Sequence, residues 1–127
     1  MPKVHQELTF AAAPSKVYRA LVDSAEHTKF TGAPADIGPA GARFTAYGGK
    51  VEGQTIELSE GERIVQAWRP ATWAPGVYSL VRIELRDEGG KTKLVLDHDA
   101  VPEEFVQHID GGWHKMYWEP LRKYVES

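Results

Sequence analysis

Apolar and polar residues alternate over the first part of the chain. In residues 4–10, Val4, Leu8 and Phe10 share one face, and the residues between them are mostly polar. A period of two is typical of a strand with one buried face. Residues 4–10 are therefore predicted to form the first strand.

The period lengthens after Pro14. Apolar residues then recur at spacings of three and four between Val17 and Val22, as on one face of a helix. Proline suits the first position of a helix, where its missing N–H would have no partner. The pattern predicts a helix of about ten residues.

A second, shorter helix is predicted from Ser24 to Phe30, because serine is a favoured N-cap residue. The segment that follows, residues 31–41, is rich in Gly, Ala and Pro. Such a composition is typical of a loop, and we expect this loop to be mobile.

Strand patterns return at residue 42 and continue to residue 100. Glycines at Gly48-Gly49, Gly61 and Gly89-Gly90 supply hairpin turns between them. The turns divide the region into five predicted strands, at residues 44–47, 51–58, 63–69, 78–86 and 93–100. Consecutive strands joined by hairpins form an antiparallel meander, and the first strand must pair with a distant one.

The C-terminal segment is predicted to be one long helix, starting at Gly111 or Gly112 with Asp110 as its N-cap. Its apolar stripe covers more than half of the circumference, which indicates a largely buried helix. Pro120 lacks the N–H that would bond the carbonyl of Met116, so we expect a bend there.

These elements predict an α+β fold with a curved six-stranded antiparallel sheet around the long C-terminal helix, and two short helices after the first strand. The 127 residues are interpreted as a single domain, residues 1–127, because neither a repeat nor a linker interrupts the pattern.

Charge and composition exclude several classes of function. A net charge of -3 and the lack of a basic cluster argue against nucleic acid as a partner. The chain has no cysteine, which excludes disulfides, thiolate metal sites and cysteine nucleophiles. The sequence shows neither a signal peptide nor a long apolar run, so we expect a cytoplasmic protein without membrane insertion.

Aromatic residues are the strongest candidates for a binding site. Trp68, Trp113 and Tyr117 are interpreted either as the lining of an aromatic pocket or as ordinary core. Trp73 lies in a predicted loop, and we expect it to fold back onto the protein. The remaining candidates add an apolar ring or a hydroxyl on neighbouring strands: Phe44, Tyr47 and Tyr78.

His98 is the leading polar candidate for this pocket. It alternates with Leu94 and Leu96, so it should face the long helix. The alternative is a core or rim histidine satisfied by a local partner. Arg82 alternates with apolar neighbours and is predicted to lie on the outer face of the sheet.

No metal, cofactor or catalytic group is predicted. The spacing between His108 and His114 fits no usual zinc pair, and the glycine pairs do not open helices as a phosphate loop requires. The serines lack the setting of a nucleophile elbow. The sequence therefore favours binding over catalysis.

Five runs along the chain carry a resemblance to a known family, in this order: VYRALVDSAEHTKFTGAPADI, GARFTAYGGKVEGQTIELSEGERIVQAWRP, YSLVRIEL, TKLVLDHDAVP and GGWHKMYWEPLRKYV. In order and spacing they resemble the homologues of the C-terminal domain of the activator of heat shock protein 90 ATPase. The resemblance implies the helix-grip fold of the SRPBCC superfamily, shared with lipid-transfer START domains and polyketide cyclases, in which sheet and helix enclose a pocket.

Three functions remain open. The first is a binding protein for a small apolar or aromatic molecule, held by Phe44, Tyr47, Trp68, Trp73, Tyr78, His98, Trp113 and Tyr117. The second is a co-chaperone-like module that binds a chaperone through the 31–41 and Trp73 loops. The third is a cyclase- or hydrolase-like enzyme that uses His98 or Tyr117 as acid or base. Either a monomer or a homodimer is compatible with each.

Overall fold

A computed structural model describes residues 3–127. Its strands are β1 (Lys3–Phe10), β2 (Arg43–Ala46), β3 (Val51–Ser59), β4 (Arg63–Pro70), β5 (Ser79–Glu88) and β6 (Lys91–Asp99). They form a six-stranded sheet in the order β1-β6-β5-β4-β3-β2, and each pair is antiparallel. The predicted meander is confirmed, and β1 pairs with β6, its most distant strand in sequence.

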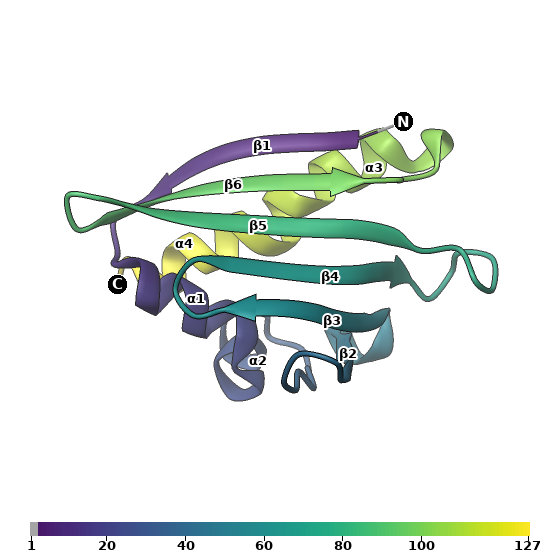
Figure 1. The fold of residues 1–127 in the computed structure, drawn as a ribbon, viewed down its shortest axis with the longest axis horizontal. Helices are drawn as coiled ribbons and strands as arrows, with labels where there is room; N and C mark the ends of the chain where they lie inside the picture. The colour runs from purple at the N-terminus through teal and green to yellow at the C-terminus, as the bar shows by residue number, and fades with distance from the viewer. Residues whose placement is uncertain (1–2) are drawn as a thin grey trace.

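The helices cover one face of this sheet (Figure 1). They are α1 (Pro14–Val22), α2 (Ser24–Thr31) and a C-terminal run composed of the 3-10 turn Glu103–Phe105, α3 (Val106–Gly112), a π-helical turn (Trp113–Trp118) and α4 (Glu119–Val125). The C-terminal run crosses behind the sheet, from α3 beside β1 to α4 beside α1. The predicted α+β helix-grip fold is confirmed.

The N-cap of α2 is Asp23 rather than the predicted Ser24. The Asp23 carboxylate accepts a hydrogen bond from the backbone N–H of Glu26 at 3.0 Å, as an N-cap does. The Ser24 hydroxyl instead accepts from the Ile37 N–H at 2.8 Å, which ties the following loop to the helix. A bridge between Asp36 and Thr45 ties the same loop to β2. These contacts give no support to the expectation that residues 31–41 are mobile.

The predicted start of the long helix is wrong by one turn or more. The helix already begins at Val106, and Asp110 lies inside it. The Asp110 side chain is used elsewhere, because its carboxylate and its carbonyl accept bonds from the Gln6 amide of β1 at 2.7 and 2.9 Å. The glycine pair that suggested a helix start is therefore accommodated within the helix.

The helix has a widened turn just before Pro120, where the sequence predicts a bend. The Glu119 N–H bonds the carbonyl of His114, five residues back, which defines a π-helical turn. Pro120 cannot donate to the Met116 carbonyl. That carbonyl accepts instead from the Tyr47 hydroxyl.

Gly53 is the glycine that the sheet can least replace. A Cβ atom there would lie 1.9 Å from the Ala67 carbonyl oxygen and 2.9 Å from the Phe44 ring. Real Cβ atoms do not approach backbone so closely, so strands β3 and β4 would have to separate.

We expect Gly53→Ala to lower the free energy of unfolding by about 3 kcal/mol through overpacking, measured by urea denaturation. The matched control is Gly111→Ala, because a Cβ at this helical glycine meets no atom within 4 Å. That variant should gain about 1 kcal/mol from helix propensity. A Gly53→Ala protein as stable as the control would contradict the interpretation.

Candidate functional site

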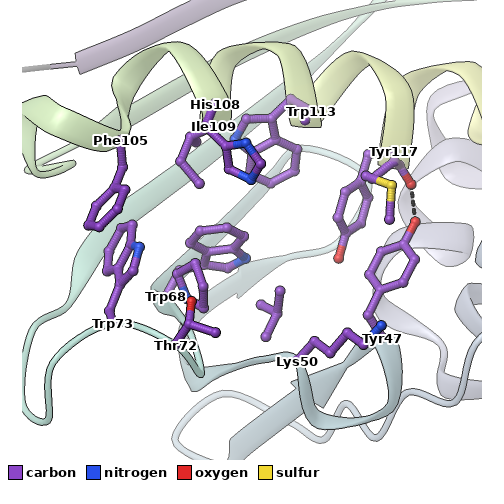
Figure 2. Close-up of a pocket in the computed structure, with 14 residues that line it drawn as sticks. Tyr47, Lys50, Trp68, Thr72, Trp73, Phe105, His108, Ile109, Trp113 and Tyr117 are labelled. Atoms are coloured by element: carbon purple, nitrogen blue, oxygen red, sulfur yellow. Dashed lines mark hydrogen bonds between the residues drawn. The ribbon is translucent and has the colours of Figure 1, made fainter.

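An open cavity of about 490 Å³ lies between the C-terminal helix and the end of β4. Figure 2 shows its walls: one from α3 and the π-helical turn, the other from β4, the Trp73 loop and the turn after β2. The lining residues are Tyr47, Lys50, Val51, Trp68, Pro70, Thr72, Trp73, Phe105, His108, Ile109, Gly112, Trp113, Met116 and Tyr117. Most of these side chains are apolar or aromatic, as in small-molecule sites.

The centre of the cavity is an aromatic wall. The indoles of Trp68 and Trp113 stack with ring centroids 5.7 Å apart and an angle of 28°. Tyr117 packs against Trp113 at 4.9 Å. Because these side chains come from a strand and from the facing helix, they fix the distance between the two layers.

Trp73 closes one end of the cavity. Its side chain is only 5% exposed and stacks on Phe105 at 5.6 Å and 15°, so the tryptophan of this loop does fold back. The buried Arg69 guanidinium holds the loop by donating to the carbonyls of Trp73, Ala74 and Val77. Several bonds from one rigid guanidinium give the loop a defined shape.

Tyr47 closes the other end, from an unfavourable backbone conformation. Its φ angle is 52°, a left-handed value that costs a residue with a side chain free energy. The hydroxyl donates to the Met116 carbonyl across the cavity mouth (Figure 2). Burial raises the pKa of Tyr47 to about 12, so this hydroxyl stays protonated and remains a donor.

His98 lies behind the aromatic wall and does not line the cavity. The Trp113 indole N–H donates to its Nδ1 at 3.0 Å, so the proton of the neutral ring is on Nε2. That proton is directed to the Ser79 hydroxyl at 2.7 Å, and Ser79 donates to the Trp68 carbonyl at 2.7 Å. Each donor in this series of hydrogen bonds from Trp113 to Trp68 has an acceptor, which corresponds to the predicted alternative of a satisfied core histidine.

The structure brings together five of the eight predicted site residues, namely Tyr47, Trp68, Trp73, Trp113 and Tyr117. Phe44 is buried beneath the sheet, because Gly53 opposite it leaves room for the ring. Tyr78 is 40% exposed and contacts the Arg69 guanidinium on the other side of the loop. Arg82 lies on the outer face, where it pairs with Asp97 at 3.3 Å.

Sequence reasoning missed a row of lining residues that runs from the 3-10 turn through α3 into the π-helical turn. Phe105, His108, Gly112 and Met116 follow each other at spacings of three and four, so they share one helical face. The signal was present in the sequence, but a helix that starts at Gly111 excludes the first two. The missed start of α3 therefore also hid part of the site.

No metal centre is found within the part of the chain that the structure describes. Residues 3–127 contain no group of three or more His, Asp or Glu side chains placed to hold a metal ion. No helix among the same residues is long and apolar enough to span a membrane.

A curved antiparallel sheet that grips a helix over an open aromatic cavity defines a helix-grip protein. The chain belongs to the family described as "Activator of Hsp90 ATPase homolog 1-like protein", whose model matches residues 11–126. The resemblance noted in the sequence is thereby confirmed.

Two curated relatives carry the activator name. The activator of 90 kDa heat shock protein ATPase homolog of Dictyostelium discoideum is 29% identical over 108 residues, 84% of this chain and 28% of its own length. Homolog 2 of Mus musculus is 27% identical over 99 residues, 77% of this chain and 30% of its own length. The chain thus spans about a third of the curated relatives it matches.

Solved structures share the fold over nearly the whole chain. An HSP90 activator from Plasmodium falciparum superposes with a TM-score of 0.92 at 20% identity, covering 99% of this chain and 97% of its own. The Aha1 dimer from Colwellia psychrerythraea gives 0.85 at 16% identity, with 99% and 97% covered. At such identities the likeness establishes the fold.

Two buried histidines predict a loss of stability in mild acid. Burial lowers the pKa of His98 to about 3 and that of His27 to about 4, against about 6.5 in an unfolded chain. Between these values the unfolded chain binds more protons, so stability is full above pH 6.5 and falls as the pH drops. His5 is exposed, and its hydrogen bond to Asp97 raises its pKa, which acts in the opposite direction.

We expect the free energy of unfolding to fall between pH 6.5 and 5 by up to about 1.4 kcal/mol per pH unit for each buried imidazole. Urea denaturation of wild type and His98→Gln measures the two slopes, and the contribution of His5 cancels in the comparison. The variant should show the shallower slope. Equal slopes would show that the pKa of His98 is the same in the folded and the unfolded chain, which would contradict the prediction.

Proposed function

We propose that this protein binds a small apolar, ring-containing molecule in the cavity between β4 and the C-terminal helix. The observation that carries the proposal is an open space of about 490 Å³ with Trp68, Trp113 and Tyr117 on its wall. Typical ligand sites measure roughly 300–1,000 Å³ and are lined in this way. A merely structural interior would be filled by side chains.

The protein itself holds the two ends of the cavity in place. Its two ends are set by hydrogen bonds to backbone carbonyls, from Tyr47 at one end and from Arg69 at the other. Neither end therefore depends on a ligand for its position. A preformed cavity spends less free energy on ordering when a ligand enters.

Two adjacent glycines of α3 offer a matched test. Gly112 lines the cavity, whereas Gly111 is exposed to solvent, and an added Cβ meets no atom within 4 Å at either. Phenylalanine at residue 112 should occupy the cavity from the row of Phe105, His108 and Met116, and phenylalanine at residue 111 should point to solvent.

Isothermal titration with tetralin, a fused apolar bicycle, measures the effect. We expect wild type and Gly111→Phe to bind one molecule with equal affinity, and Gly112→Phe to bind at least about tenfold more weakly, a difference of 1.4 kcal/mol. Thermal shift under the same conditions should follow the affinities. Absence of tetralin binding to wild type, or equal binding to both variants, would overturn the proposal.

A second candidate is a role in the ATPase cycle of Hsp90. It is supported by the family match over residues 11–126 and by relatives that are named as activators of this ATPase. The chain would then be a binding module for the chaperone.

The ATPase rate of Hsp90 from the same organism, with and without this chain, tests that role. An activator raises the rate in proportion to its occupancy, and an unchanged rate at saturating chain would remove the candidate. Gly112→Phe distinguishes the two roles, because a surface-bound module should keep its effect when the cavity is filled.

A further inference from the structure

A buried histidine and tyrosine form a pair at the inner end of the cavity. His27 of α2 is 2% exposed and Tyr117 of the π-helical turn is 8% exposed. The His27 Nε2 and the Tyr117 hydroxyl oxygen lie 3.2 Å apart. His27 lies outside the cavity lining, and its short helix gave no sequence signal for a site.

The pair holds two protons but forms only one hydrogen bond. A neutral imidazole carries one N–H and a phenol carries one O–H. The Nδ1 of His27 has no hydrogen-bond partner among residues 3–127. The backbone of His27 itself is close enough to the ring to act on its pKa, but the His27 carbonyl already accepts from the Thr31 hydroxyl at 2.8 Å.

The position of these protons follows from the cost of a buried N–H without an acceptor. If the Tyr117 hydroxyl donated to Nε2, the imidazole proton would sit on Nδ1, where only the already occupied His27 carbonyl is near it, which is unfavourable in a buried site. The better arrangement has Nε2–H donating to the Tyr117 oxygen. The Tyr117 O–H is then left to donate to another group.

That remaining donor faces the cavity. Figure 2 shows the Tyr117 hydroxyl directed into the space between Trp68 and Tyr47. Among residues 3–127 its oxygen has no bonded neighbour except His27. Burial raises the pKa of Tyr117 and lowers that of His27 to about 4, so both groups stay neutral at neutral pH.

Tyr47 provides the contrast at the same cavity. Its hydroxyl proton is already given to the Met116 carbonyl, so it has none to offer a ligand. The ring centroids of Tyr47 and Tyr117 lie 5.7 Å apart, and both side chains line the same cavity. They differ in whether the proton is already bonded within the protein.

We infer that the cavity selects ring-containing molecules that carry a carbonyl oxygen, which accepts a hydrogen bond from Tyr117 while the rings pack against Trp68 and Trp113. His27 is a positioning residue, because it occupies the Tyr117 oxygen and turns the O–H toward the cavity. This inference rests on the proposed ligand-binding function and specifies its ligand class.

The test compares tetralin with 1-tetralone, which differ by one ring CH₂ replaced by C=O. Isothermal titration of wild type should show 1-tetralone bound roughly two- to tenfold more tightly, the range that one hydrogen bond provides. Tyr117→Phe should bind both probes with the affinity that wild type has for tetralin. Tyr47→Phe loses the bond that holds one end of the cavity, so it should bind both probes more weakly while the ratio between their affinities stays that of wild type.

A second measurement reports the hydrogen bond itself. The ¹³C resonance of carbonyl-labelled 1-tetralone should move downfield on binding to wild type and Tyr47→Phe, because a hydrogen bond polarises the carbonyl, and should not do so in Tyr117→Phe. His27→Gln, which keeps a donor, should retain more of this shift than His27→Leu. Loss of tetralin binding would reveal a variant with a damaged cavity.

The possible failures are distinguishable. If wild type binds neither probe, the proposed function falls and this inference falls with it. If both probes bind equally, or if Tyr117→Phe keeps the preference for the ketone, the inference is overturned while ligand binding stands. A preference for the ketone that is lost only in Tyr47→Phe would identify Tyr47 as the donor and would overturn the inference.

Discussion

Pro120 removes one hydrogen bond from the C-terminal helix, and the arrangement of the site depends on how the chain responds. The helix adopts a π-helical turn over Trp113–Trp118. In an α-helix, residues five apart point about 140° away from each other, whereas a π-helical turn brings them closer to one direction. Trp113 and Trp118 accordingly stack at 5.2 Å and 16°. Their indole N–H groups reach two strands, through His98 of β6 and Gln6 of β1.

The same turn also keeps the cavity open. The Met116 carbonyl, which Pro120 cannot bond, holds the Tyr47 hydroxyl and so places the turn after β2 at the mouth. At the other end, Arg69 fixes the Trp73 loop against the start of the helix. The helix thus packs on the sheet through Trp113 and Trp118. Two separate contacts, one from Tyr47 and one from the Trp73 loop, join it to the rest of the protein at the two ends of the cavity. The cavity lies between these two contacts.

The sheet could be predicted from the sequence because alternation and turn glycines are local signals, and strand pairing followed from hairpin connections. The start of α3 could not be predicted, because Asp110 is a good N-cap residue when it is considered by itself. Only its hydrogen bonds to Gln6, over a hundred residues away in the sequence, show that it serves another role. His98 was placed on the correct face, yet alternation does not reveal that the Trp113 indole covers it. His27 was missed because its contact with Tyr117 depends on how α2 packs beneath the C-terminal helix.

Donor and acceptor counts separate the polar groups that stabilise this fold from the one available to a ligand. Gln6 and His98 are buried with their donors and acceptors matched by the C-terminal helix and the sheet, so they define how the helix docks. The Tyr47 proton is likewise used within the protein. In the His27–Tyr117 pair one proton is left over, and the geometry places it at the cavity wall. A buried donor without an acceptor destabilises a protein, so a ligand that supplies the acceptor gains affinity at the position where the fold is incompletely satisfied.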